Sequence, residues 1–268
     1  MEIHATSDIP ATDEVVGVAN PSGRGGVLFV CEHASSFIPP EFDNLGLEEA
    51  ARVSHIAWDP GALAVAQKLS AAFDSPLVFQ RVSRLVYDCN RPPEAPSAMP
   101  DVSEIFTIPG NAGLTDGQRR DRAERFYFPF RAALGARIEA GKAAGHPPVI
   151  VTIHSFTPVY KGARRAVEIG ILHDSDSRLA DAVLDAAGDE FVVGRNDPYG
   201  PEDGVTHTLI EQGVKRGLLN VMIEIRNDLI AEAAGIDTMA GYLTRVLRAA
   251  IATVDTTISG SAATGGTA

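Results

Sequence analysis

The chain has 268 residues, of which 45% are hydrophobic and 22% charged, a composition typical of a globular protein with one sizeable core. Its net charge of −12 argues against partners such as nucleic acid or an anionic membrane, because both need a basic surface. A small anionic substrate is not excluded, since a few arginines can reverse the sign of the charge inside a pocket.

Residues 1–24 contain Pro, Gly, Ser and Asp without periodicity, which predicts a flexible leader. This segment lacks the apolar core of a signal peptide, and no later stretch reaches the roughly 18–20 apolar residues of a transmembrane helix. Cys31 and Cys89 each lie in an apolar run and are interpreted as buried, reduced thiols. We therefore expect a cytoplasmic protein.

The first half of the remaining chain alternates short apolar runs with amphipathic stretches. The patterns predict strands over 26–33, 76–82 and 84–90, helices over 47–55 and 59–73, and a Pro- and Gly-rich loop over 91–114. Asp59 is the expected N-cap of the second helix, with Pro60 in its first turn.

The second half continues the alternation. The patterns predict a long helix over 115–145 with a kink at Pro129, strands over 148–154, 166–174, 190–194 and 219–226, and helices over 176–187, 205–217 and 237–256. The small polar residues from Ser259 to the end predict a disordered tail. Apolar strands alternating with helices indicate one α/β domain over 25–258, with a largely parallel sheet between helices.

Polar residues gather at the predicted carboxyl ends of the strands, where open α/β sheets bind ligands. They are Glu32 and His33, then Asp88, Asn90 and Arg91, then His154 and Ser155, and finally Glu224 and Arg226. No glycine-rich phosphate loop accompanies them, since GRGG at 23–26 precedes the first strand.

Each of these residues also has a purely structural interpretation. A single histidine is more often a hydrogen-bonded structural residue than a ligand, and Asp59 alone is most simply a helix cap. Glu224 is harder to explain in this way, because a carboxylate inside an apolar strand costs several kcal/mol unless it is paired or functional. The coincidence of all these residues favours a metal-dependent hydrolase.

Zinc suits this set, because hydrolytic zinc sites use three protein ligands and leave the fourth position to water. His33, Asp59 and His154 are the predicted ligands, and Glu224 is the predicted general base. Asn90 and Arg91 would hold a substrate carboxylate. Arg84 would either stabilise an oxyanion or form a surface ion pair.

Two neighbours of these residues are also assigned. Ser155 and Arg226 are expected to contact substrate, and Arg226 with Asp228 has the alternative role of orienting Glu224.

Five segments in this order resemble the N-formylglutamate amidohydrolase family. They are VCEHASSFIPPEF (30–42), HIAWDPGALAVA (55–66), SRLVYDCNRP (83–92), VTIHSFTPVYKG (151–162) and VMIEIRNDLI (221–230). The resemblance implies a zinc-dependent hydrolase that cleaves the formyl amide of N-formylglutamate to formate and glutamate. It also implies a fold similar to the zinc carboxypeptidases, with an eight-stranded mixed sheet between helices.

Within this resemblance His33 and His154 match the zinc-binding histidines and Glu224 the general base, while the pair Asn90–Arg91 matches the residues that hold the substrate's carboxylate. The acidic zinc ligand of the carboxypeptidases lies three residues after the first histidine, where this chain has Ser36. The acidic ligand must therefore come from elsewhere, and Asp59 is preferred to Glu41.

The motifs describe a catalytic centre and do not define the acyl group. Another N-acyl amino acid or a peptide-like amide is an alternative substrate, and a binding protein that kept the fold but lost catalysis is an alternative of another class. The sequence leaves the oligomeric state, the physiological metal and the pathway open.

Overall fold

The computed structural model describes residues 14–263, and the side chains of its last helix as far as Val254. Its central sheet has seven strands in this part of the chain. In spatial order they are β1 (Val16–Ala19), β3 (Leu77–Gln80), β2 (Val27–Cys31), β6 (Val149–Phe156), β11 (Asn220–Arg226), β9 (Ile169–Leu172) and β10 (Val193–Arg195).

Strands β3, β2, β6 and β11 run parallel, whereas β1 is antiparallel to β3 and β9 is antiparallel to β11. The predicted α/β fold with a mixed, largely parallel sheet is confirmed. The described residues supply seven strands of this sheet, rather than the eight that the family resemblance implied.

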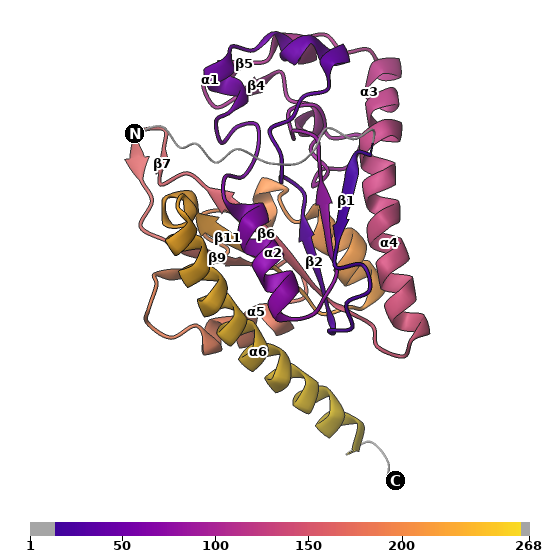
Figure 1. The fold of residues 1–268 in the computed structure, drawn as a ribbon, viewed down its shortest axis with the longest axis vertical. Coiled ribbons are helices and arrows are strands. Elements are labelled where there is room, and N and C mark those ends of the chain that lie inside the picture. Colours follow the sequence, from indigo (N-terminus) through magenta and orange to yellow (C-terminus); the bar gives the residue numbers. More distant parts are fainter. Residues whose placement is uncertain (1–13, 264–268) are drawn as a thin grey trace.

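Helices cover both faces of the sheet (Figure 1). One face carries α2 (Ala62–Ala72), α5 (Arg178–Ala186) and α6 (Ala233–Ala263), and the other carries α4 (Phe128–Ala143). In β2 the side chains alternate between the two layers: Val27 and Phe29 pack toward α2 and α6, and Leu28 and Val30 toward α4. Burial on both faces explains the continuous apolar runs of these strands.

The strand predicted over 84–90 is absent, and these residues form a buried turn. The Ser83 hydroxyl donates to the Ala57 carbonyl over 2.8 Å and accepts from the Leu85 amide over 3.2 Å, and the Val86 amide donates to the Ser83 carbonyl over 2.9 Å. Local bonds thus take the place of a strand ladder, while Leu85 and Val86 are buried in the core. A short apolar run signals burial but does not distinguish a strand from a compact turn.

The buried side chains of Asn111 and Arg122 form hydrogen bonds to this turn. Asn111 Nδ2 donates to the carbonyls of Leu85 (2.9 Å) and Pro100 (2.8 Å), and Asn111 Oδ1 accepts from Arg122 Nη1 over 2.7 Å. Arg122 also donates to the Val86 carbonyl over 3.3 Å. Asn111 is therefore the centre of a network that fixes residues 85 and 86.

Replacing Asn111 with alanine is expected to lower the free energy of unfolding by about 3 kcal/mol, because each buried group left unsatisfied costs about 1–3 kcal/mol. Urea denaturation measures the loss. Gln67, exposed on α2, is the matched control, since its replacement with alanine should change stability by less than about 0.5 kcal/mol. Equal midpoints for the two variants would show that the network does not stabilise the turn.

The long helix predicted over 115–145 is divided. It consists of α3 (Asp116–Arg122), a π-helical turn (Ala123–Tyr127) and α4, which has Pro129 in its first turn. Proline has no amide hydrogen for the helix ladder, so the irregular turn lies next to the predicted kink. The segment predicted as a helix over 205–217 is a π-helical turn (Leu209–Gly213) and a 3₁₀ turn (Val214–Arg216), and it ends at Gly217 as predicted.

Smaller elements differ from the predictions in length. Helix α1 (Glu49–Arg52) is shorter than the predicted 47–55. The loop over 91–114 includes the hairpin β4 (Val102–Ser103) and β5 (Phe106–Thr107), and a second hairpin after β6 has strands β7 (Val159–Tyr160) and β8 (Ala163–Arg164).

The two ends of the chain are more structured than expected. Strand β1 lies inside the predicted leader and pairs with β3, and α6 continues to Ala263, past the expected start of the tail at Ser259. The rest of the predicted leader and tail, at 1–13 and 264–268, lies outside the described residues.

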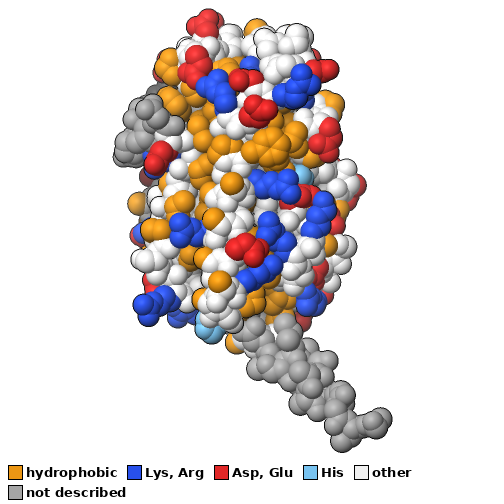
Figure 2. Space-filling model, turned by 90° about the vertical axis from the view of Figure 1, so that its right-hand side faces the viewer, with side chains coloured by type: hydrophobic (Ala, Val, Ile, Leu, Met, Phe, Trp, Pro, Cys, Tyr) orange, Lys and Arg blue, Asp and Glu red, His pale blue; other side chains and the backbone are white. Residues whose placement is uncertain are grey.

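The described part of the chain contains no helix with the length and apolar character needed to cross a membrane. Figure 2 shows the face that carries α3 and α4, where Lys and Arg side chains lie among Asp and Glu side chains.

Candidate metal centre

Three buried side chains meet beyond the carboxyl end of the parallel strands. His33 lies just after β2, Asp59 lies just before α2, and His154 lies within β6, two residues before the end of that strand. His33 Nδ1 and His154 Nδ1 are 3.2 Å apart. Asp59 Oδ2 is 3.3 Å from His33 Nδ1 and 2.9 Å from His154 Nδ1. The three atoms face a common point.

The structure corrects the helix-cap interpretation of Asp59. The N-cap of α2 is Gly61, at φ 82°, and no side chain caps this helix. Asp59 Oδ2 instead lies near the two histidines and accepts from the Ser155 amide over 3.2 Å. The backbone carbonyl of Asp59, not its carboxylate, accepts the Ala62 amide at the helix start.

A carboxylate lies close to the Nε2 atom of each histidine. His33 Nε2 is 2.7 Å from Asp88 Oδ1, and His154 Nε2 is 3.1 Å from Glu32 Oε2. A proton on His33 Nε2 is donated to Asp88 and leaves the lone pair of His33 Nδ1 free for a metal ion, whereas His154 Nε2 and Glu32 form an ion pair without hydrogen-bond geometry among the described residues. Histidines that bind metal ions usually have a carboxylate beside the ring nitrogen that does not face the ion.

The donor set fits a divalent metal ion. Ligand atoms about 2.0–2.1 Å from a tetrahedral centre lie about 3.3–3.4 Å from one another, close to the separations between these three atoms. Two imidazole lone pairs directed at a carboxylate oxygen repel one another unless a cation or protons lie between them. His33, Asp59 and His154 are thus a group able to hold a metal ion.

The charges in this cluster interact strongly enough to outweigh burial. Burial alone would raise the pKa of Asp59, but the imidazoles of His33 and His154 hold it far below its ordinary value. Burial would lower the pKa of His154, but the carboxylates of Glu32 and Asp59 raise it well above its ordinary value. An ion bound here takes the place of protons, so metal binding should release them.

Glu224 stands beside this centre. It lies opposite His154 in the register of β11 and β6, and alternation places it on the same face as Met222, away from α2 and α6. Burial, with a contribution from Asp59, raises its pKa to about 7. Its buried Oε2 has no hydrogen-bond partner among the described residues. This carboxylate can therefore exchange a proton near neutral pH.

A cavity of about 310 Å³ opens onto both groups. Its wall includes Arg84 and Arg91, the β4–β5 hairpin, and Phe156, Tyr160 and Tyr199. Arg84 Nη2 donates to Asp88 Oδ2 over 2.7 Å, and Arg84 Nη1 is 3.6 Å from Asp59 Oδ1. Arg84 thus forms an ion pair, as one of its two predicted interpretations has it, but its partners are buried beside the candidate ligands and not on the surface.

Comparison with known proteins agrees with this site. The profile of the N-formylglutamate amidohydrolase family matches residues 25–231. The chain belongs to this family. No functionally curated protein matches it.

Two solved structures are similar to this one. The crystal structure of gene product Atu2144 from Agrobacterium tumefaciens has a TM-score of 0.89 and 56% sequence identity, covering 90% of this chain and 96% of that chain. The crystal structure of N-formylglutamate amidohydrolase from Ralstonia eutropha JMP134 has a TM-score of 0.58 and 20% identity, covering 88% of this chain and 96% of that chain. At this lower identity the second likeness shows a common fold.

In this member of the N-formylglutamate amidohydrolase family, Asn90 holds the cavity wall together. Asn90 Oδ1 accepts the Thr208 amide over 2.9 Å, and Asn90 Nδ2 donates to the Val205 carbonyl. Arg91 Nη1 donates to the Gly204 carbonyl over 2.7 Å. The predicted pair therefore fixes segment 204–208, and both residues line the cavity.

Two other predicted substrate contacts have structural partners. The Ser155 hydroxyl donates to the Pro60 carbonyl over 2.8 Å, which ties β6 to the start of α2. Arg226 pairs with Asp228 over 2.8 Å and with Glu168 over 3.2 Å and is not among the residues that line the cavity. The predicted Arg226–Asp228 pair is thus present, whereas Arg226 does not line the cavity in which a substrate contact was predicted.

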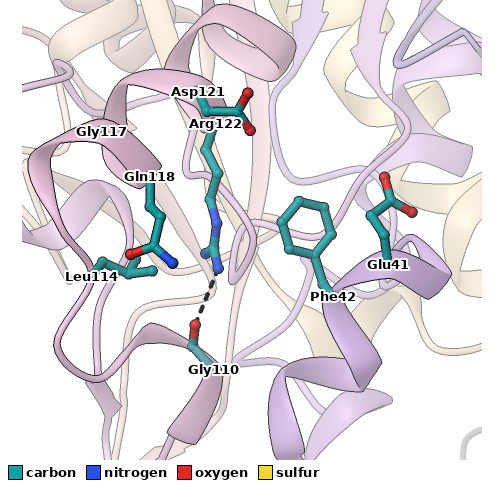
Figure 3. A pocket seen from close by; sticks show the side chains of 8 residues that line it. All are labelled: Glu41, Phe42, Gly110, Leu114, Gly117, Gln118, Asp121 and Arg122. Atoms are coloured by element: carbon teal, nitrogen blue, oxygen red, sulfur yellow. Dashed lines mark hydrogen bonds between the residues drawn. The ribbon is translucent and has the colours of Figure 1, made fainter.

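Glu41, the alternative acidic ligand, lies at a different cavity of about 440 Å³ (Figure 3). Half of its side chain is exposed, and it pairs with Arg125. Phe42 and Arg122 line this second cavity, which includes no histidine. The geometry therefore selects Asp59 over Glu41 as the carboxylate that joins the histidines.

Glu32 and Asp88 are recognised from the sequence as polar residues at strand ends, but neither of them is assigned a role in the site there. Glu32 had a detectable signal, because it is a carboxylate at the end of an apolar strand and directly precedes a candidate ligand. The pairing of Asp88 with His33 spans 55 positions and depends on the buried turn at 84–90, which the sequence pattern does not reveal.

Proposed function

We propose that the protein is a zinc-dependent amidohydrolase that cleaves the N-formyl amide of N-formylglutamate, or of a similar N-acyl amino acid, to formate and the free amino acid. One observation carries the proposal: His33 Nδ1, His154 Nδ1 and Asp59 Oδ2 converge at a cavity that also contains the unpaired Oε2 of Glu224. Membership of the family supports the formyl amide as the bond that is cleaved.

Zinc held by His33, Asp59 and His154 would supply a Lewis acid for the amide carbonyl and the attacking water. Glu224 accepts the proton of that water and passes it to the leaving nitrogen as the C–N bond breaks, so the amine departs neutral. Arg84 faces the oxygen on which negative charge develops.

The charges in the cavity support an anionic substrate. Arg91 contributes a guanidinium to the cavity wall near Asn90, and its bond to the Gly204 carbonyl keeps it in place. A substrate carboxylate bound there would leave the acyl end directed at the metal centre. We also propose a cytoplasmic location, supported by the two free, buried cysteines Cys31 and Cys89.

The decisive experiment follows formate release from N-formylglutamate by zinc-loaded protein. The panel includes N-formylalanine, which lacks the second carboxylate, and N-acetylglutamate, which changes the acyl group. We expect the highest kcat/KM for N-formylglutamate, and no activity above background in His154→Ala. Faster cleavage of N-acetylglutamate or of a dipeptide would favour the alternative hydrolase. Metal-free protein with no activity on any amide would favour a binding protein.

A further inference from the structure

Glu32 and Glu224 lie on either side of His154: Glu32 directly follows β2, and His154 and Glu224 lie in β6 and β11. Val30 of β2 lies opposite Thr152 of β6, and two residues further along both chains lie Glu32 and His154. On the other side of β6, His154 lies opposite Glu224 of β11. Side chains two residues apart share a face of the sheet, so His154 stands between two carboxylates. The proposed mechanism uses Glu224 and gives Glu32 no part.

The surroundings of Glu32 differ from those of Asp88. The side chain of Glu32 has 0% exposure and its ion pair is with His154. Asp88 is shared, because Oδ1 accepts from the Asn90 amide over 2.9 Å and lies 2.7 Å from His33 Nε2, while Oδ2 accepts from Arg84. Burying a carboxylate raises the free energy of the folded state unless the interaction with a partner offsets the lost hydration. The position of Glu32 is therefore explained by what it does for His154.

We propose that Glu32 is the positioning residue of His154 and controls how tightly the chain retains its metal ion. The Glu32 carboxylate lies 3.1 Å from His154 Nε2, and this buried ion pair restrains the orientation in which Nδ1 faces the ion and makes the imidazole a stronger donor. The inference rests on the metal-binding part of the proposed function.

Asp88 has a second task that Glu32 lacks. Because it holds both His33 and Arg84, its loss disturbs a metal ligand and a group that faces substrate. Glu32 is not among the residues that line the cavity. Neutralising Glu32 should therefore lower metal affinity alone, whereas neutralising Asp88 should lower both metal affinity and substrate affinity.

The test compares Glu32→Gln with Asp88→Asn, and uses Glu168→Gln as a control because Glu168 pairs with Arg226 away from the histidines. Zinc affinity is measured by competition with a chelator, and the visible spectrum of the cobalt-loaded protein reports the ligand field. Glu32→Gln should weaken zinc binding by about 10–100-fold and shift the cobalt spectrum, with KM at saturating metal unchanged. Asp88→Asn should weaken zinc binding and also raise KM, and Glu168→Gln should change neither.

Glu32→Leu provides a second variant, because it removes both the charge and the acceptor and replaces a buried polar group with an apolar one. It should bind zinc no more tightly than Glu32→Gln. Zinc binding as tight as in the unmodified protein, in either Glu32 variant, would overturn the inference. If the unmodified protein itself binds no metal, the proposed function fails instead, so the two failures are distinguishable.

Discussion

Replacing Glu224 with glutamine is expected to lower kcat by about 10²–10⁴-fold, the usual contribution of a general base, while zinc content stays at about one ion per chain. Glutamine has nearly the same shape but cannot accept the proton of the attacking water. The side chain is not one of the three candidate ligands, so the ion should remain. Formate release and metal analysis on the same preparation measure both quantities.

The same variant controls for loss of folding. The pKa of Glu224 in the folded protein, about 7, lies above the ordinary value of 4.5. Its ionised form therefore opposes folding, by an amount that grows from pH 4.5 to about 7 and is constant above that. At pH 8 the metal-free glutamine variant should unfold at the same urea concentration as the unmodified protein, or at a higher one. Near-normal kcat would show that Glu224 is not the base, and loss of zinc would make it a ligand.

Sequence patterns located the centre because its main residues interrupt apolar strands. His33 follows one buried strand, and His154 and Glu224 lie within two others that pair in register. Burying a polar group costs free energy, so a polar residue in such a run requires a partner or a function. Neighbouring parallel strands end at one edge of a sheet, and this made their convergence predictable.

Side-chain direction was the part that the sequence did not define. Asp59 before Pro60 satisfies the local rule for a helix cap, but a carboxylate that satisfies this rule can equally turn toward a distant partner. The apolar residues at 85–87 satisfy the rule for a strand, but Ser83 and Asn111 provide their backbone with other hydrogen bonds. In both places tertiary contacts outweighed local preference.

The side chains predicted to contact substrate have structural partners as well, although Asn90, Arg91 and Ser155 line the cavity. Asn90, Ser155 and Arg226 adjoin the motifs in sequence, and each is engaged by backbone or carboxylate groups that hold the site together. Proximity along the chain identified the neighbourhood of the site and not the direction of each side chain. Arg84 also lies in the cavity wall, where its carboxylate partners hold it.

Asp59→Ala is expected to abolish both metal retention and activity, because it removes one of three converging ligand atoms. Zinc affinity should fall by more than the roughly 10–100-fold that an outer carboxylate costs, and His154→Ala should behave in the same way. Metal content after dialysis against dilute chelator, and formate release before and after added zinc, measure the effect.

The alternative role of Asp59 makes a different prediction for the same variant. If Asp59 only capped α2, its replacement with alanine would lower the free energy of unfolding by about 1 kcal/mol. The zinc content would not change. Ser155→Ala is the control, because it removes the hydroxyl bound to the Pro60 carbonyl but keeps the backbone amide that donates to Asp59. It should retain zinc. Gly61 is the N-cap of α2 and no side-chain cap is present, which contradicts the role of a cap for this carboxylate, and full zinc content in Asp59→Ala would contradict its role as a metal ligand as well.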